Sequence, residues 1–449
     1  MRKGNRILSG LLALVMAAVM LLCPAEAITY EPDFTPTSKA VYLENLDTGL
    51  ILYEKNADEK MYPASLTKIM TAIVVLENVK DLDGETAEYP MWIQNMLYGT
   101  NASLGGLIVG EELTIRQLLT SALVQSGNES AMILAGYVGS GGMADFMPRD
   151  ITTFVEMMND KAKALGCTGT HFTNPTGLHS DNTYTTARDM AIMAKYAMQK
   201  SAFSSIVKNY AVQLGQTNKH ADLWQYSTNK MLLTSSPYYY APVVGIKTGS
   251  TDEAGRCVIS QAEDSGYHYF CVVMGSPVTA AEPYQNFIET RQLYRWAFGN
   301  FSLRTLLEQG ELMAEVPVKY SGDGKVAKLA IKEDVVQLLR DDISLDSIIY
   351  KAELPEFVEA PIAAGDTVGK MHVMLMGEEI GTVELVATQA FSLSWFRKAL
   401  GTIGSLLSST VAKVIFIVVV LAIAGYIVYA VRHNKKRKKH RSKYSDRNY

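Results

Sequence analysis

Cysteine is scarce in this chain of 449 residues, which has four cysteines in all. One of them, Cys23, lies in an N-terminal apolar run, which leaves Cys167, Cys257 and Cys271 for the rest of the chain. An odd number leaves at least one thiol unpaired, so the sequence predicts no disulfide framework. Cys257 and Cys271 lie in apolar runs typical of strands, where a cysteine packs as a small hydrophobic residue.

Histidine pairs with the spacing of metal ligands are also missing. His171 and His179 are too far apart to share one face of a helix. The sequence therefore predicts neither a zinc site nor any other metal or cofactor.

Positive charge is short in the long middle part of the chain. Residues 28–431 carry a net charge of −14, once the +8 of residues 432–449 and the +2 of residues 1–27 are taken from the total of −4. Such an acidic surface repels phosphate, which argues against a nucleic acid as partner.

The two ends of the chain indicate export and membrane attachment. Residues 1–27 combine basic residues, an apolar core and small residues up to Ala27, where we expect cleavage of a signal peptide. The apolar run 412–431 is long enough to cross a hydrocarbon core of ~30 Å as a helix. The basic residues of 432–449 predict a cytoplasmic tail against anionic lipid, which places the preceding domains outside the cell membrane.

The pattern between these ends predicts an α+β domain over residues 35–302. Strand-like runs at 40–45 and 50–55 come first, helical patterning dominates from Leu66 to about Lys208, and strand-like runs return at "CVISQA" and "YHYFCVVMG". This order suggests a sheet assembled from both ends of the segment with a helical insert between them. A segment of this size is large for one core, so we expect two lobes with a cleft.

The chain changes character after this domain. Residues 305–388 show short alternating runs with turns between them, which predicts a small β-rich domain. Residues 391–411, "FSLSWFRKALGTIGSLLSSTV", are expected to form an amphipathic stalk at the membrane surface before the spanning helix.

A serine and a lysine lie three residues apart in the stretch "MYPASLTKIM". Pro63 is typical of a chain that enters a helix, and the spacing places Ser65 and Lys68 on one face of the first turn. A lysine whose pKa is lowered by burial or by a nearby cation can act as the base that activates such a serine. On spacing alone an ordinary helix start is the better interpretation, because the same S-x-x-K spacing recurs at Ser205 and Lys208.

Two later motifs change this balance. Ser126-Gly127-Asn128 lies in a break between two helical runs, and Lys247-Thr248-Gly249 opens the strand-rich region. The order S-x-x-K, S-x-N, K-T-G is the signature of penicillin-binding proteins and class A β-lactamases.

A second set of such motifs would run from Ser205 through Ser227 to Lys247. It leaves only about twenty residues between successive motifs, which is too few for a helical lobe to fold over a sheet. The set that begins at Ser65 leaves that room and is preferred.

With these motifs in place, the chain resembles serine D-alanyl-D-alanine carboxypeptidases, the low-molecular-mass penicillin-binding proteins of the peptidase S11 type. The similar stretches, among them "PASLTKIMTA", "LLTSALVQSGNESAMILA", "MNDKAKALGCTGTHFTNPTGL" and "VGIKTGSTDEAGRCV", cover nearly all of residues 38–300. The resemblance implies a β-lactamase/transpeptidase-like domain, in which an antiparallel sheet carries a helical lobe. A small all-β domain and one C-terminal transmembrane helix would follow.

The resemblance also implies a reaction, the removal of the terminal D-alanine from D-Ala-D-Ala stem peptides of peptidoglycan, without a cofactor. The acyl-enzyme would form on Ser65, which β-lactam antibiotics would also acylate. Lys68 would be the base, and Ser126 would relay the proton to the leaving D-alanine. Backbone N–H groups of Ser65 and Ser250 would hold the oxyanion. The implied substrate contacts are Asn128, Lys247, Thr248, Gly249 and Ser250.

The sequence departs from the family pattern at two places. Thr183 stands where the family often has a histidine, in a segment that we expect to pack rather than to react. The stretch "GSPVTAAEPYQNFIETR" lacks an arginine before Arg291 that would help to bind the substrate carboxylate. We therefore expect Lys247 and the Thr248 hydroxyl to carry that recognition, with help from Ser250.

Two alternative functions remain open at this point. A β-lactamase shares the three motifs, but "EMMN" at Glu156–Asn159 lacks the E-x-x-L-N spacing associated with the deacylating carboxylate. A catalytically silent wall-binding scaffold would use residues 305–388 instead, and the intact motif residues argue against it.

Overall fold

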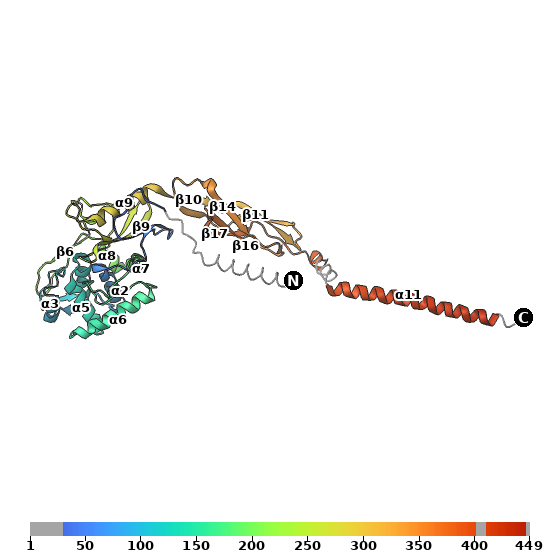
Figure 1. Ribbon diagram of the computed structural model, residues 1–449, viewed down its shortest axis with the longest axis horizontal. Coiled ribbons are helices and arrows are strands. Elements are labelled where there is room, and N and C mark those ends of the chain that lie inside the picture. The colour runs from blue at the N-terminus through green and yellow to red at the C-terminus, as the bar shows by residue number, and fades with distance from the viewer. Residues whose placement is uncertain (1–29, 401–409, 446–449) are drawn as a thin grey trace, which may run out of the picture. The chain divides into compact units, whose positions relative to one another are not determined.

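In the computed structural model, which describes residues 30–400 and 410–445, the chain separates into two units (Figure 1). The first contains the described residues up to Ser302 together with Leu338–Asp342, and the second contains Leu303–Gln337 and the chain from Ile343 onward. The predicted signal peptide, residues 1–27, lies outside the described residues.

An antiparallel sheet of five strands organises the first unit, in the spatial order β2-β1-β9-β8-β7. Its strands come from both ends of the unit, because Ala40 on the first strand pairs with Met274 on the last. The strand that opens with Lys247 lies at one edge of this sheet. The strands are β1 (Ala40–Asn45), β2 (Ile51–Lys55), β7 (Lys247–Thr251), β8 (Gly255–Asp264) and β9 (Tyr267–Ser276).

Successive side chains of β9 point to opposite faces of the sheet, because side-chain direction in a strand repeats every two residues. Tyr269 packs its ring 4.8 Å from that of Phe298 on α9 (Gln285–Asn300), which covers one face. Phe270 and Val272 point the other way, into the core shared with the helical lobe.

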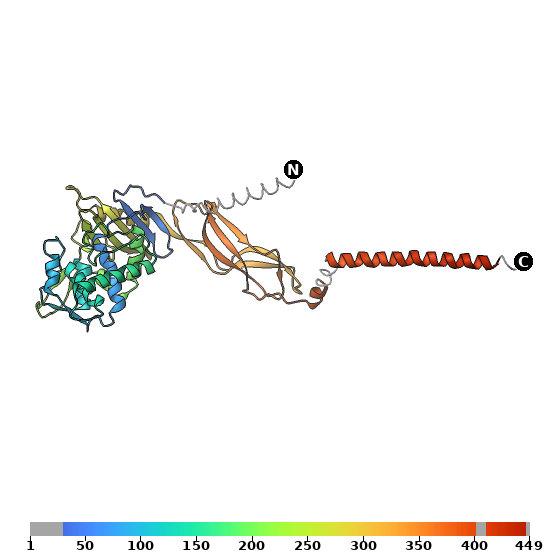
Figure 2. The ribbon, with the colours of Figure 1, turned by 60° about the horizontal axis from the view of Figure 1, so that its bottom comes forward.

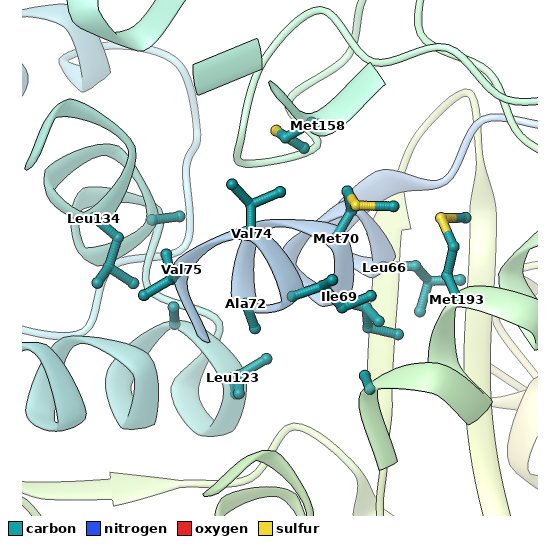
Figure 3. Packing of buried hydrophobic residues seen from close by; sticks show 14 of the residues in the cluster. Leu66, Ile69, Met70, Ala72, Val74, Val75, Leu123, Leu134, Met158 and Met193 are labelled. Carbon is teal, nitrogen blue, oxygen red and sulfur yellow. The ribbon is translucent and has the colours of Figure 1, made fainter. Parts of the chain in front are cut away.

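The helical lobe surrounds α2 (Lys68–Asn78), whose apolar residues up to Val75 are buried (Figure 3). A helix that is hydrophobic all round belongs inside a core, and this burial fixes the turn η1 (Ala64–Thr67) at its start. Figures 1 and 2 show α5 and α6 grouped with α2 on the side away from α9. The other helical elements are α3 (Met91–Leu97), α4 (Ile115–Thr120), the π-turn η2 (Ser121–Gln125), α5 (Asn128–Gly139), α6 (Pro148–Ala164), α7 (Ala187–Met198) and α8 (Ser201–Val207).

Two short two-stranded sheets and one further turn lie within or just after the predicted helical region. Each of their strands spans three residues, which is too short for alternation to be recognised in a sequence. The elements are β3 (Thr86–Glu88) with β4 (Glu112–Thr114), β5 (Ala211–Gln213) with β6 (Trp224–Tyr226), and the 3₁₀ turn η3 (Lys230–Leu232).

The second unit is rich in strands, as its alternating sequence predicts. A sheet of six strands has the order β14-β16-β17-β12-β11-β15, and β10 pairs with β13. Leu329, Val373 and Leu385 are fully buried in its core. The elements are β10 (Phe301–Leu307) and β13 (Val335–Arg340), each of which has residues in both units, and, wholly within the second unit, β11 (Leu312–Lys319), β12 (Val326–Ile331), η4 (Leu345–Ser347), β14 (Ile348–Glu353), β15 (Val358–Glu359), β16 (Thr367–Leu375) and β17 (Glu378–Ala387).

The C-terminal part of the chain contains the long helix α11 (Thr410–Ser445). Within it, Lys413–His433 is long and apolar enough to cross a membrane by length and composition. Of the predicted stalk, Phe391 is buried and pairs with Ile362 of the sheet unit, whereas Trp395 is 80% exposed. Residues 401–409 of the stalk lie outside the described part of the chain.

Candidate active site

The side chains of Ser65 and Lys68 meet at the start of the central helix. The turn η1 brings Lys68 Nζ to 3.1 Å from Ser65 Oγ. Lys68 Nζ also donates to Asn128 Oδ1 and to the carbonyl oxygen of Thr176, each at 2.7 Å. These contacts hold one amine between three elements of the lobe and leave the serine hydroxyl within hydrogen-bond reach of it.

Burial is the main cause that holds the pKa of Lys68 well below its usual range, since the side chain is 1% exposed. The second cause is the charge of Lys247, and the charge of Glu129 acts in the opposite direction. A cation that has lost its water and lies near another cation gives up its proton easily. The amine beside Ser65 is therefore suited to act as a base near neutral pH.

Ser126 and Lys247 form a second hydrogen-bonded pair at the site. Lys247 Nζ donates to Ser126 Oγ at 2.9 Å and to the carbonyl oxygen of Thr248 at 3.0 Å. Burial lowers the pKa of Lys247 to about 7. Ser126 ends η2 in the left-handed region, at φ 65° and ψ 32°, a conformation that a serine adopts at an energetic cost and that is common at functional sites.

Gly249 lets the edge strand β7 approach the turn that carries Ser65. A Cβ atom at this position would lie 2.9 Å from the carbonyl oxygen of Pro63 and 3.1 Å from the backbone nitrogen of Ser65. Both neighbours are backbone atoms and cannot swing away as a side chain would. Glycine is therefore required for the spacing between β7 and the nucleophile turn.

We expect Gly249→Ala to slow acylation of Ser65 by a β-lactam by about tenfold or more, because a displacement of about 1 Å at a reacting centre can cost up to 10²-fold. The rate would be measured with a fluorescent penicillin. Gly299→Ala is the matched control, since its Cβ would meet open space on α9. Equal rates in the two variants would show that the close approach of β7 does not matter.

Two cavities meet at Ser65. One, of about 340 Å³, is lined by Ser126 and Thr248 and by two cations, Lys230 and Arg256. The other, of about 360 Å³, is lined by Asn128 and by the carboxylates Asp252 and Glu253. Ser65, Ser103 and Ser250 line both cavities.

The predicted site residues lie close to Ser65, whereas the alternative pair, Ser205 and Lys208, lies outside the site. Ser205 lies on α8 with its hydroxyl bonded to the carbonyl oxygen of Ala202, and it lines neither cavity. Thr183 is buried and its hydroxyl lies 2.5 Å from that of Thr173, so this segment packs in the lobe. Among the described residues, no group of three or more histidines, cysteines or carboxylates could hold a metal ion.

Sequence reasoning missed the carbonyl oxygen of Thr176 as a partner of Lys68. The Asn174 side chain shapes this turn, because its Oδ1 accepts from the backbone N–H groups of Thr176 and Gly177. The segment "NPTGL" carries a recognisable turn signal, but no side-chain pattern shows which carbonyl oxygen it aims at the site. Ser103, Tyr210, Thr228 and Arg256 also line the first cavity and belong to none of the three motifs.

Comparisons with known proteins agree with this geometry. Residues 26–278 match the family model of Peptidase S11, the D-alanyl-D-alanine carboxypeptidases, and residues 301–392 match the C-terminal domain of penicillin-binding protein 5. The chain therefore belongs to the D-alanyl-D-alanine carboxypeptidase family, a family of serine-type hydrolases, as its sequence predicted. The predicted carboxypeptidase function is confirmed at this level, and the alternative functions are not favoured.

Individual relatives span most of the chain. The D-alanyl-D-alanine carboxypeptidase DacF of Bacillus subtilis is 29% identical over 396 residues, which are 86% of this chain and 95% of DacF. The carboxypeptidase of Streptomyces sp. strain K15 is 34% identical over 272 residues, 59% of this chain and 88% of that protein.

Solved structures confirm the predicted fold class. Penicillin-binding protein 5 of Haemophilus influenzae, with 27% identity, matches at a TM-score of 0.60 over 81% of this chain and 100% of its own. DacD of Francisella tularensis matches at a TM-score of 0.62 over 82% of this chain and 97% of its own, with 24% identity, and shows the fold. Both likenesses extend through the lobed catalytic unit and the following β unit.

Proposed function

We propose that this protein removes the terminal D-alanine from D-Ala-D-Ala stem peptides of peptidoglycan through an acyl-enzyme on Ser65. The observation that carries the proposal is the position of Lys68 Nζ, buried and 3.1 Å from Ser65 Oγ. Family membership supports the substrate class, and it also supports acylation by β-lactams.

The contacts of Lys68 indicate how the serine becomes nucleophilic. A neutral amine has two N–H groups and one lone pair. The two N–H groups donate to the oxygens of Asn128 and Thr176, each 2.7 Å away, so the lone pair is left to accept the proton of Ser65. As this proton moves to Nζ, Oγ attacks the carbonyl carbon of the penultimate D-alanine.

The later steps also use Ser126, Lys247 and backbone N–H groups. The developing oxyanion lies between the backbone N–H groups of Ser65 and Ser250. Ser126 passes a proton to the nitrogen of the leaving D-alanine as the C–N bond breaks, and the proton that Lys68 took from Ser65 restores the Ser126 hydroxyl, so Lys68 is neutral again. Lys247 holds Ser126 Oγ in position through their 2.9 Å hydrogen bond. Water then attacks the ester carbonyl and gives a proton to Lys68, and Lys68 returns this proton to Ser65 Oγ as the ester C–O bond breaks.

Peptide mapping with a fluorescent penicillin tests the assignment. The ectodomain should carry one covalent label on Ser65, and a peptide that ends in D-Ala-D-Ala should release one D-alanine. A label on Ser205, or fast turnover of penicillin without release of D-alanine, would contradict the proposal.

The charge on Lys247 should set the pH dependence of acylation. Because this charge lowers the pKa of Lys68, the acid limb of the pH–rate profile should lie well below pH 10.5, and the rate should rise as Lys68 loses its proton. In Lys247→Gln that limb should move to higher pH, since one cause of the lowered pKa is gone. Lys208→Gln, at an exposed lysine, is the control. An unchanged limb in Lys247→Gln would show that the two amines do not interact.

We also propose that α11 crosses the cell membrane, with both folded units outside and the C-terminus in the cytoplasm. The apolar segment Lys413–His433 supports the crossing. The basic residues that follow it support the orientation, because Lys and Arg concentrate on the cytoplasmic side.

A further inference from the structure

Two cations lie together at one end of the cavity of about 340 Å³ that holds Ser65. Arg256 Cζ lies 4.9 Å from the ring centroid of Tyr284, and Lys230 Nζ lies 4.6 Å from the same centroid. All three residues line the cavity, whose lining contains no aspartate or glutamate. The ring therefore holds two positive charges near one another without neutralising either of them.

Arg256 has an unused hydrogen-bond donor in this position. Its Nε is buried and has no partner, and within the described part of the chain no carboxylate forms an ion pair with it. The nearby carboxylate of Glu282 is engaged by the Tyr238 hydroxyl at 2.9 Å and by the Tyr284 backbone N–H at 3.0 Å. Leaving a buried donor of a charged group unpaired is costly, so this geometry favours an anionic ligand.

The strand register places Arg256 beside the motif that faces the substrate. Arg256 on β8 pairs directly with Ser250 on β7, and side chains of such a pair begin about 5 Å apart on the same face of the sheet. Thr248, two residues before Ser250, shares that face by the period of the strand. The Thr248 hydroxyl lies 2.5 Å from that of Thr228, and both residues line the same cavity as Arg256.

The two cavities that meet at Ser65 are lined by charges of opposite sign. Beyond Ser65 the second cavity is lined by Asp252 and Glu253, whereas the first is lined by Lys230 and Arg256. A substrate with a negative end is drawn into the first cavity and repelled from the second. The leaving side of the scissile bond therefore lies toward Arg256.

We propose that Arg256, with Lys230 across the ring of Tyr284, binds the terminal carboxylate of the substrate. The inference rests on the proposed function, because a carboxypeptidase must recognise that carboxylate. The inference gives to Arg256 the carboxylate-binding role that the sequence led us to expect of Lys247. Lys247 lines neither cavity, and its Nζ lies 2.9 Å from Ser126 Oγ. Thr248 then adds one hydrogen bond from its hydroxyl.

Arg291, the next arginine along the chain, is not placed for this role. It lies on α9, donates to the carbonyl oxygen of Pro237 at 2.9 Å, and lines neither cavity. It therefore provides a matched control, an arginine of the same domain with its charge outside the site.

The experiment compares two peptides that differ only in their last group, a free carboxylate or a carboxamide, and measures kcat/KM for each. In Arg256→Gln the preference for the free acid should fall by about 10- to 100-fold, because hydrogen bonds to a charged group are lost for one substrate only. Lys230→Gln should reduce the preference by a smaller factor, and Arg256→Lys should keep part of it, because a point charge remains. Arg291→Gln should keep all of it.

The outcomes separate this inference from the proposed function. If Arg256→Gln keeps the circular dichroism of the unchanged protein and slows both peptides equally, or if Arg291→Gln rather than Arg256→Gln removes the preference, the carboxylate site is elsewhere and the inference is wrong. If the unchanged protein releases no D-alanine from the free acid, the proposed function itself fails. If Arg256→Gln is misfolded, it slows both peptides and Lys230→Gln decides instead. That variant must lower the preference for the free-acid peptide if the two cations bind the carboxylate.

Discussion

Lys68→Met is expected to slow acylation of Ser65 by penicillin by about 10²–10⁴-fold, the usual contribution of a general base. The substitution keeps an unbranched side chain of similar length in the buried position and removes the amine. The backbone turn η1 and the hydroxyl of Ser65 then remain while their base is missing. Single-turnover mixing with a fluorescent penicillin would give the acylation rate directly.

Lys208→Met provides the control for this variant. Lys208 follows Ser205 with the same spacing, but its side chain is exposed and Ser205 lines neither cavity. Its acylation rate should equal that of the unchanged protein. A Lys68→Met protein that remains folded by circular dichroism and acylates at the normal rate would remove Lys68 from the mechanism.

Truncation after residue 411 is expected to move the protein completely from the membrane fraction to the soluble fraction. The deletion removes Lys413–His433, the segment long and apolar enough to span a bilayer, and insertion of such a helix is effectively irreversible. Fractionation followed by labelling with fluorescent penicillin would locate the active protein in both forms.

Deletion of residues 434–449 alone is the matched control, because it removes most of the basic tail and keeps the apolar segment. That protein should stay in the membrane fraction. If instead the chain cut after residue 411 also stayed there, the exposed Trp395 and Phe396 would be sufficient for attachment.

The sequence predicted the local part of the site well. Ser65 and Lys68 lie within one turn, so their spacing alone placed the two side chains on one face. The contact of Ser126 with Lys247 joins residues far apart in the chain, and only the order of the motifs and the resemblance to a family brought them together. Sequence order contains no direct measure of such a distance.

Other parts of the site could not be predicted from residue types. The carbonyl oxygen of Thr176 belongs to the backbone, which every residue has. Arg256 belongs to none of the three motifs, and its position in the cavity depends on the register between β7 and β8. The burial of Lys247 and its hydrogen bond to Ser126 likewise depend on how closely β7 approaches the lobe, which residue types do not show.

The pairing of β1 with β9 means that the sheet cannot be completed until most of the first unit has been made. β1 is made early, yet its partner Met274 follows Ala40 by more than two hundred residues, and contacts of such separation form slowly. The strand that places Gly249 against Ser65, and Lys247 against Ser126, also comes late in this unit. A chain that has been made only as far as the helical lobe therefore carries Ser65 and Lys68 without Lys247 and Gly249 beside them, so we expect hydrolysis to begin only after the edge of the sheet is complete.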